Sequence, residues 1–224
     1  MRCSCLVPFY NEGSRIGRVL VEILKSKEVD EIVCVDDGSS DGGSSMVRGR
    51  FPGVKLVVLK RNKGKTGAVR EGLKKIGNEL VVLIDADLRK FKVAEMDAAI
   101  KRMKRGDVDM VVLRRVEYGI FVKLIRGDVL ITGERVMRAD DLREALGDEG
   151  LKCYQMEPVI NQYMIDKGKR IVWMPHGAVS TNTISKVGML RGVKKEWEML
   201  GEIKDSVGVK NFVYQYLFFG WKKG

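Results

Sequence analysis

Residues 79–87 read ELVVLIDAD, an apolar run that ends in two carboxylates. Apolar runs of similar length occur four more times in the first half of the chain, at residues 3–8, 31–37, 54–59 and 109–113. Stretches with helical spacing of apolar residues separate these runs, for example Ile16, Val19, Leu20 and Ile23. Continuous apolar strands that alternate with amphipathic helices are typical of a mainly parallel sheet covered by helices on both faces. We therefore predict an α/β, Rossmann-like fold.

The second half of the chain has a looser pattern from residue 114 onward. We expect three short elements there: an extended segment at 133–139, a helix at 140–146 and a strand at 170–175. Another helix is predicted to open at Glu157-Pro158, because proline is well placed in a first helical turn. Residues 193–224 look helical and end in an aromatic stretch.

The length and the net charge of the chain limit the number of domains and the kinds of partner that we expect. The chain has 224 residues, 45% of them hydrophobic, which is enough for one compact domain with a core. Its 41 Lys and Arg against 30 Asp and Glu give a net charge of +11. Such a surplus favours an anionic partner, namely nucleotide phosphates, an acidic acceptor, a lipid surface or nucleic acid.

The cysteines and the first residues of the chain indicate the cellular compartment that we expect for this protein. Cys3, Cys5, Cys34 and Cys153 form no CxxC pair and no even disulfide spacing, and the first three fall in predicted strands, where small thiols are commonly buried. The first residues enter a strand at once without signal-peptide features, and no apolar run reaches the ~18 residues that span a bilayer. We therefore expect a reducing, cytoplasmic compartment.

Polar clusters follow four of the predicted strands. They are PFYNE at 8–12, DDGSSDG at 36–42, NKGK at 62–65 and DAD at 85–87. In parallel sheets the carboxyl ends of the strands lie at one edge, and ligands bind beyond that edge. The sequence therefore predicts one site to which all four clusters contribute.

The Asp85-Ala86-Asp87 motif indicates a metal site. Alternate strand residues point to the same side, so beyond the strand end both carboxylates can approach one hard cation. Mg²⁺ or Mn²⁺ prefers oxygen ligands, often bridges to substrate phosphates and stabilises charge on a departing nucleoside diphosphate. A solvated turn that caps a helix is the alternative, and the motif alone does not decide between the two.

Two well-known phosphate-binding motifs are excluded. Gly64-Lys65-Thr66 would need a glycine at the position of Leu59 to form a Walker A loop. No GxGxxG follows the first strand, which argues against a dinucleotide-binding fold. Lys65 near a helix start can still contact a phosphate. Asp37 at a strand end can accept hydrogen bonds from a nucleobase or a ribose, although a loop that caps the next helix is the alternative.

In this order and at these strand ends, VPFYNE, VDDGSSDG, NKGKTGAVREG and DAD resemble the family-2 nucleotide-sugar glycosyltransferases of the GT-A fold. The resemblance is strong over residues 3–88 and fainter to about residue 185. It implies a UDP- or GDP-sugar donor and a Mg²⁺ or Mn²⁺ cofactor. By position it assigns the nucleotide to Pro8, Tyr10, Glu12, Asp37, Lys65 and Asp85, and the metal to Asp85 and Asp87, with Asp87 the more direct ligand.

The resemblance also divides the chain. Residues 1–113 would be the nucleotide-sugar-binding half and 114–192 the acceptor-binding half of the same domain, followed by a helical, aromatic tail at 193–224. Within the acceptor-side part, His176 follows a predicted strand, and a late histidine completes the metal site in several enzymes of this fold. A hydrogen-bonded histidine at a strand end is the alternative.

Glu157 corresponds loosely to the acid that deprotonates the acceptor hydroxyl in inverting relatives, so we predict it as a catalytic residue together with Asp87. The family's usual paired acids are missing, because Gln155 and Met156 precede Glu157. A helix-start glutamate favoured by the macrodipole is the alternative. A phosphate acceptor is already nucleophilic and would need no such base.

The middle segment is rich in arginine and resembles the corresponding part of polyprenyl-phosphate sugar synthases, in which arginines hold phosphates. The candidate acceptor ligands are Arg114, Arg115, Arg126, Arg135 and Arg138, with ordinary surface charge as the alternative for any one of them. The aromatic run at 212–223 either lies at a membrane interface or docks on the core or on a second subunit of a homodimer.

We therefore predict a metal-dependent, cytoplasm-facing glycosyltransferase, a hexosyltransferase of the family-2 type. The acceptor is either a polyprenyl phosphate at the inner face of the membrane or a soluble saccharide or small phosphorylated acid. A non-catalytic protein that binds nucleotides or nucleic acid is the alternative of a different class. No nucleic-acid-binding motif stands out, so we expect no nucleic-acid partner.

Overall fold

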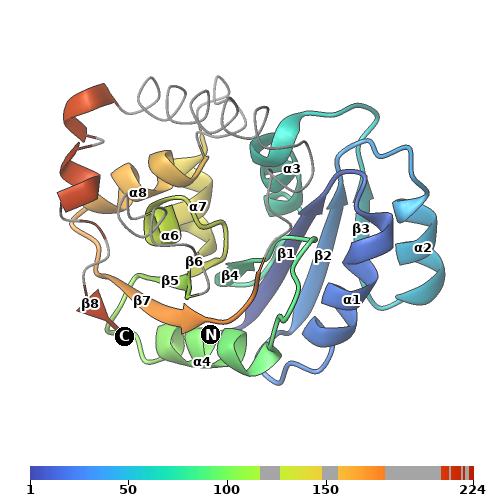
Figure 1. The fold of residues 1–224 in the computed structure, drawn as a ribbon, viewed down its shortest axis with the longest axis horizontal. Helices are drawn as coiled ribbons and strands as arrows, with labels where there is room; N and C mark the ends of the chain where they lie inside the picture. Colours follow the sequence, from blue (N-terminus) through green and yellow to red (C-terminus); the bar gives the residue numbers. More distant parts are fainter. Residues whose placement is uncertain (117–126, 148–155, 180–207, 212, 218, 220–221) are drawn as a thin grey trace.

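A single mixed sheet forms the centre of the molecule. The computed structural model describes residues 1–116, 127–147, 156–179, 208–211, 213–217, 219 and 222–224. Within this part of the chain, eight strands are arranged in the order β3-β2-β1-β4-β6-β5-β7-β8 (Figure 1). The strands are β1 (Cys3–Phe9), β2 (Glu31–Asp36), β3 (Lys55–Val58), β4 (Leu80–Leu83), β5 (Met110–Arg115), β6 (Arg135–Arg138), β7 (Ile171–His176) and β8 (Lys222–Lys223).

Most neighbouring strands are parallel, as predicted. The exception is β6, which runs antiparallel to both of its neighbours, β4 and β5. The expected extended segment at 133–139 is therefore a strand, but one that is inserted in the opposite direction. Its start lies at the sheet edge where β4 and β5 end, and its end lies at the opposite edge.

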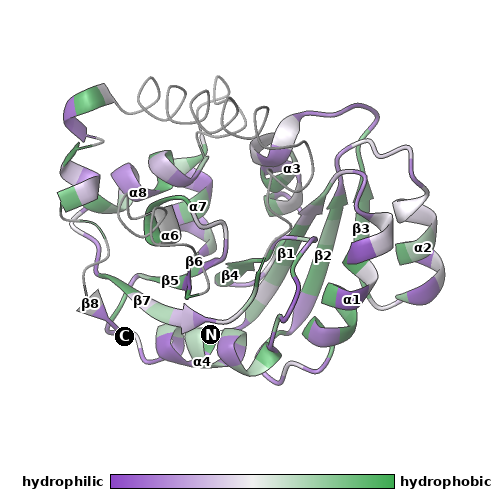
Figure 2. Cartoon of the chain, in the orientation of Figure 1, coloured by the Kyte–Doolittle hydropathy of each residue, from purple (hydrophilic) through white to green (hydrophobic). Residues whose placement is uncertain are grey.

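Helices cover both faces of the sheet, which confirms the predicted α/β class. One face carries α1 (Gly13–Ile23), α2 (Gly43–Arg50) and α4 (Val93–Lys104), and the other carries α3 (Gly64–Leu73), α6 (Gly127–Leu130), α7 (Ala139–Ala145) and α8 (Met156–Asp166). Successive residues of β1 contribute to opposite cores, Cys5 and Val7 to one and Leu6 to the other. Apolar residues are concentrated along β1 and β2 (Figure 2).

The order in which successive strands are added to the sheet reverses at β1. It moves outward from β1 to β2 and β3, and α3 then returns it to β4 on the other side of β1. The helices that follow β1 and β3 consequently lie on different faces (Figure 1). A crevice forms at such a switch point beyond the carboxyl ends of the strands, where open α/β sheets bind their ligands.

The described part of the C-terminal tail packs on the domain. Residues 208–211 and 213–217 are helical, with Gln215 and Phe219 buried. Lys222–Lys223 form β8, which pairs in parallel with β7. Docking on the core is thus confirmed for Gln215 and Phe219, whereas Phe212 and Trp221 of the aromatic run lie outside the described residues.

The predicted buried thiols are confirmed for Cys3, Cys5 and Cys34, which are free and lie in the core. Burial raises the pKa of Cys34 to about 12, so this thiol stays protonated and unreactive at neutral pH. Cys153 lies outside the described residues. Among the helices that the structure describes, none has the length and apolarity that a bilayer crossing requires.

Close packing of α3 on the sheet makes Gly72 a sensitive position. A Cβ at this residue would collide with Leu6 Cδ1 and would lie 2.9 Å from Val35 Cγ2, whereas a Cβ at Gly49 in α2 would meet nothing within 4 Å. We expect Gly72→Ala to lower the free energy of unfolding by about 1–3 kcal/mol through overpacking. Gly49→Ala should leave it unchanged or raise it by up to about 1 kcal/mol. Urea denaturation measures both, and equal effects would contradict the packing argument.

Candidate functional site

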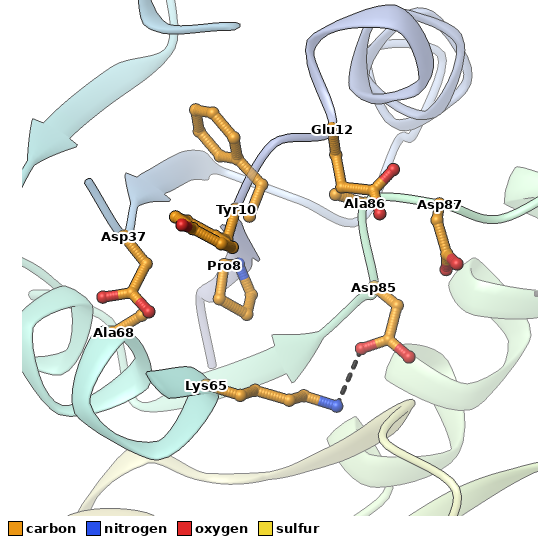
Figure 3. A pocket seen from close by; sticks show the side chains of 10 residues that line it. Pro8, Tyr10, Glu12, Asp37, Lys65, Ala68, Asp85, Ala86 and Asp87 are labelled. Carbon is orange, nitrogen blue, oxygen red and sulfur yellow. Dashed lines mark ion pairs between the residues drawn. The ribbon is translucent and has the colours of Figure 1, made fainter. Parts of the chain in front are cut away.

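A pocket of about 250 Å³ lies at the switch point, beyond the carboxyl ends of β1, β2 and β4 (Figure 3). Seven residues that the sequence assigned to nucleotide or metal line it together: Pro8, Tyr10, Glu12, Asp37, Lys65, Asp85 and Asp87. They come from four separate chain segments, which Figure 3 shows around one space. The predicted convergence of the four polar clusters on one site is therefore present in the structure.

The pocket lining is acidic although the whole chain is basic. Among the described lining residues, Glu12, Asp37, Asp85 and Asp87 are acidic and Lys65 is the single cation, a formal balance of 1 − 4 = −3. The net charge of the chain is +11. Arg15 and Arg115 lie outside this lining and pair with Glu12 and Asp85, so the formal balance with them is −3 + 2 = −1. The charge that remains is negative and opposes the entry of a nucleoside diphosphate without a cation.

Hydrogen bonds between the loops after β1 and β2 hold the two loops together. The Asn11 amide donates to Ser39 Oγ at 2.9 Å, and the Ser40 amide donates to Asn11 Oδ1 at 2.9 Å. The Gly13 amide donates to Asp41 Oδ2 at 2.7 Å. Asn11 has a φ of 53°, in the left-handed region that asparagine tolerates better than most residues. One rigid unit thus carries both loops to the pocket.

Asp36 and Asp37, the two carboxylates that follow each other at the end of β2, have different structural roles. Asp36 accepts a hydrogen bond from the Ser39 amide at 2.8 Å and one from the Ser44 hydroxyl, so it shapes the loop. Asp37 lines the pocket and accepts from the Lys63 amide at 2.7 Å. Burial raises the pKa of Asp37 above its ordinary value, and the amide bond partly offsets this. Asp37 is therefore the carboxylate of this pair that a ligand meets.

Asp85 is held between two cations. Lys65 Nζ lies 2.8 Å from Asp85 Oδ1, and Arg115 Nη2 donates to Asp85 Oδ2 at 3.0 Å (Figure 3 shows the first contact). Burial alone would raise the pKa of Asp85, but Lys65 and Arg115 outweigh it and hold the pKa well below its usual range. Asp85 is thus ionised at neutral pH, and each of its oxygens faces a positive group.

Two further acids extend this arrangement into an alternating series of charges. Lys65 Nζ also lies 3.0 Å from Glu157 Oε1, and Arg115 Nε donates to Glu134 Oε2 at 3.0 Å. We call Glu157, Lys65, Asp85, Arg115 and Glu134 the charge series. Asp85 and Glu157 together outweigh burial and raise the pKa of Lys65 above its ordinary value. Every member therefore has an oppositely charged neighbour.

Sequence reasoning missed Glu134 and Gly133. Glu134 is fully buried and also accepts from the Thr132 hydroxyl at 2.8 Å. A Cβ at Gly133 would collide with Lys65 Nζ and lie 3.0 Å from Asp85 Oδ1, so glycine leaves the space that Lys65 occupies. Both residues precede β6, and their position follows from its antiparallel direction. The sequence signal for both residues is the segment TGER at 132–135, in which a glycine and an acid stand directly before the arginine that begins β6.

The arginines of the middle segment do not gather at one place. Arg115 joins the charge series, but Arg135 is fully buried, with Nη1 donating to Asn161 Oδ1 at 3.0 Å. Arg114 lies over the Trp173 ring at 4.6 Å. We correct the assignment of Arg135 to the acceptor, since a fully buried guanidinium that bonds within the protein is a structural group.

Arg138 does not join the site either. Arg138 pairs in register with Leu80 at the beginning of β4, the sheet edge opposite to Asp85, so its assignment to the acceptor is likewise corrected. The antiparallel direction of β6 is the physical reason. Arg126 lies outside the described residues.

His176 ends β7 beside Arg115, its register partner in β5. Its Nδ1 lies 2.9 Å from Glu95 Oε2, and its Nε2 is buried with no hydrogen-bond partner among the described residues. Burial lowers the pKa of His176, which favours the neutral ring with the proton on Nδ1 and a lone pair on Nε2. This is the form of imidazole that ligates metals.

Two side chains at or near the pocket carry donor atoms that suit a divalent cation. The described residues contain no cluster of three or more histidine, cysteine, aspartate or glutamate side chains arranged as a metal cage. Mg²⁺ sites commonly have one or two carboxylates and take their other oxygens from water and substrate phosphates. Asp87 at the pocket wall and His176 Nε2 are the side chains whose chemistry suits such a site.

Solved structures share this fold. A glucosyl-3-phosphoglycerate synthase from Mycobacterium tuberculosis, in complex with Mn²⁺, UDP and phosphoglyceric acid, superposes with a TM-score of 0.72. It is 17% identical and the match covers 92% of this chain and 78% of that chain. The same enzyme in complex with Mg²⁺ and UDP gives a TM-score of 0.71. The GT-A fold is thereby shown.

Curated relatives match the N-terminal part of the chain. An undecaprenyl-phosphate 4-deoxy-4-formamido-L-arabinose transferase of Proteus mirabilis is 32% identical over 96 residues, 39% of this chain. A dolichyl-phosphate beta-glucosyltransferase of Dictyostelium discoideum is 32% identical over 98 residues, 38% of this chain. The chain spans only 29% and 30% of the length of these two relatives. The sequence model of glycosyl transferase family 2 matches residues 4–156, more than half of the chain, and the chain therefore belongs to that family.

Proposed function

We propose that this protein transfers a sugar from a nucleoside diphosphate sugar to a phosphate-bearing acceptor, with the help of Mg²⁺ or Mn²⁺. The observation that carries the proposal is the meeting of Tyr10, Asp37, Lys65 and Asp87 in one pocket at the switch point of the sheet. The family and the fold agree with this activity.

The residues of the pocket suit the parts of a nucleotide sugar. Asp37 would accept hydrogen bonds from the base or the ribose, and the exposed ring of Tyr10 offers a surface for the base. Pro8 and Glu12 shape the same wall. Lys65 would meet the diphosphate, because phosphate oxygens can replace the carboxylates that surround its ammonium group.

The acidic lining supports the proposed metal dependence. A diphosphate that enters a pocket with a formal balance of −3 among the described lining residues needs a compensating cation. Asp87 and His176 would hold it, and it would stabilise the negative charge on the departing nucleoside diphosphate. Asp85, whose two oxygens face Lys65 and Arg115, would orient the ribose and these cations rather than act as the main metal ligand.

The state of Glu157 favours a phosphate as the nucleophile. Glu157 Oε1 lies 3.0 Å from Lys65 Nζ, so this carboxylate already holds a cation of the pocket. An acceptor phosphate is nucleophilic without deprotonation, so Glu157 would serve to position Lys65. Two relatives are named for undecaprenyl phosphate and dolichyl phosphate, and a structural neighbour was solved with phosphoglyceric acid.

Two sources of acceptor phosphate remain as candidates within this proposal. A polyprenyl phosphate would bring the reaction to the cytoplasmic face of a membrane, and a small phosphorylated acid would leave it in solution. Among the predicted acceptor arginines that the structure describes, Arg115 is the one that contacts Asp85, and its guanidinium suits either phosphate.

Donor binding provides the direct test of the proposed function. With Mn²⁺ present, a UDP- or GDP-sugar should raise the melting temperature of the protein, because a ligand at 100 times its Kd adds about 2.7 kcal/mol of stability. Mass spectrometry should then detect sugar transfer to polyprenyl phosphate in detergent or to 3-phosphoglycerate. If no sugar nucleotide changes the melting temperature with either metal, the proposal is wrong.

Asp87 should be essential to transfer. We expect Asp87→Ala to lower kcat about 10²–10³-fold, the usual effect of losing one group that stabilises transition-state charge. Asp107→Ala, which removes an exposed carboxylate paired with Arg102, should stay within about twofold and serves as the matched control. Near-normal turnover of Asp87→Ala would remove the metal assignment from this residue.

The pH dependence of stability tests the neutral state of His176, the single histidine of the chain. Burial lowers its pKa in the folded state, so between pH 5.5 and 7.5 the unfolded chain binds more protons than the folded one. The free energy of unfolding should therefore fall as the pH drops, by at most about 1.4 kcal/mol per pH unit. In metal-free buffer His176→Gln should flatten this slope, and an unchanged slope would contradict a buried neutral imidazole.

A further inference from the structure

We call the pocket at the switch point, which is lined by Tyr10, Asp37, Lys65 and Asp87, the donor pocket. A second cavity lies on the other side of α3. It measures about 580 Å³ and is lined by Arg61, Lys63, Gly67, Arg70, Glu71, Leu73, Lys74, Arg143, Leu146 and Gly147. We call it the basic groove. Lys65 and Ala68 of α3 line the donor pocket, whereas Lys63, Gly67, Arg70, Glu71 and Lys74 line the basic groove. Helical spacing thus separates the two sets on one helix.

The basic groove is strongly positive. Its described lining has five cations and one acid, Glu71, a formal balance of 5 − 1 = +4. Lys63 Nζ and Lys74 Nζ share Glu71, at 2.7 and 2.9 Å, which still leaves one positive charge in that trio. Arg61 adds a guanidinium that makes no ion pair with any residue that the structure describes. Arg143 Nη1 lies 2.7 Å from Asp140 Oδ1, outside the lining, which lowers the formal balance to 4 − 1 = +3. The rest of the surplus has no ion-pair partner among the described residues.

Two arginines of the groove are fixed in place by the backbone. Arg70 Nε donates to the Leu146 carbonyl at 2.6 Å, and Arg143 Nη2 donates to the Ile76 carbonyl at 2.9 Å. Arg70 Nη2 is buried and has no hydrogen-bond partner among the described residues. A buried N–H without an acceptor is unfavourable, so this atom favours an oxygen-bearing ligand. The guanidinium groups are thus oriented before any ligand arrives.

We propose that the basic groove binds a phosphate-bearing anion at a site separate from the donor pocket. Arginine forks match the spacing of phosphate oxygens, and lysines add point charges around them. The ligand is an oligophosphate or the phosphate of a lipid headgroup, since both present the same chemistry to Arg61, Arg70 and Lys74. The site is independent of the proposed sugar transfer, because none of these residues lines the donor pocket.

Matched charge variants of the full chain test this proposal. Arg61→Gln/Lys74→Gln removes two cations from the basic groove, and Arg18→Gln/Arg48→Gln removes two exposed cations from α1 and α2, on the opposite face of the sheet. Calorimetry with inorganic tripolyphosphate and flotation with phosphatidylglycerol vesicles provide the two probes. UDP binding, which the groove variant should retain, reports separately on the donor pocket.

We expect the wild type and the α1/α2 variant to bind tripolyphosphate or vesicles within twofold of each other, and the groove variant to bind at least fivefold more weakly. Added salt should weaken the binding. Binding of tripolyphosphate alone would identify a free oligophosphate, and binding of vesicles alone a headgroup. Equal losses in both variants, or no binding of either probe by the wild type, would overturn the proposal.

Discussion

The position of Asp85 between Lys65 and Arg115 is the constraint on which the rest of the site depends. The charge series that contains them passes from the pocket into the interior, and exposure falls along it from 25% at Asp85 to 6% at Arg115 and zero at Glu134. Removal of Lys65 would leave Glu157, and removal of Arg115 would leave Glu134, as a largely buried carboxylate without its ion-pair partner in the series, which is destabilising. Residues before and after position 114 are therefore joined by charge as well as by apolar contact. Asp85, which lines the pocket, is also the side chain that these ion pairs orient.

The sheet topology brings this series together from distant parts of the sequence. Parallel β4 and β5 deliver Asp85 and Arg115 at their carboxyl ends, and α3 delivers Lys65 from the face that it covers. Only an antiparallel strand brings the residues that precede it to this same edge, which is why Glu134 arrives from the start of β6. Parallel strands contribute only the residues that follow them to this edge of the sheet. The antiparallel strand β6 contributes a residue that precedes it, the buried Glu134.

Sequence patterns predicted the first half of the molecule well, because β1, β2 and β4 are buried on both faces and the candidate site residues lie at or just beyond the ends of strands. Asp37 and Asp87 could be placed in one pocket from that rule alone. In the second half the arginines were grouped by their closeness in sequence and by a family resemblance, neither of which reveals the direction of β6 or the burial of Arg135. The direction of a strand depends on tertiary pairing, which is not encoded in the period of its apolar residues.

The two cavities beside α3 have opposite charges, and this contrast explains how one basic protein can treat two anions differently. The described lining of the donor pocket sums to −3 and that of the basic groove to +4. A diphosphate would enter the donor pocket only together with a cation, so binding there would depend on metal, and release of the product would be coupled to the same ion.

An anion would enter the basic groove directly, with arginines already oriented by the Leu146 and Ile76 carbonyls. Since both cavities use side chains of the short helix Gly64–Leu73 or its immediate ends, an occupied groove would also offset part of the positive charge around Lys65. The net charge of +11 is therefore not spread evenly over the molecule, because this one helix separates an acidic pocket from a basic groove.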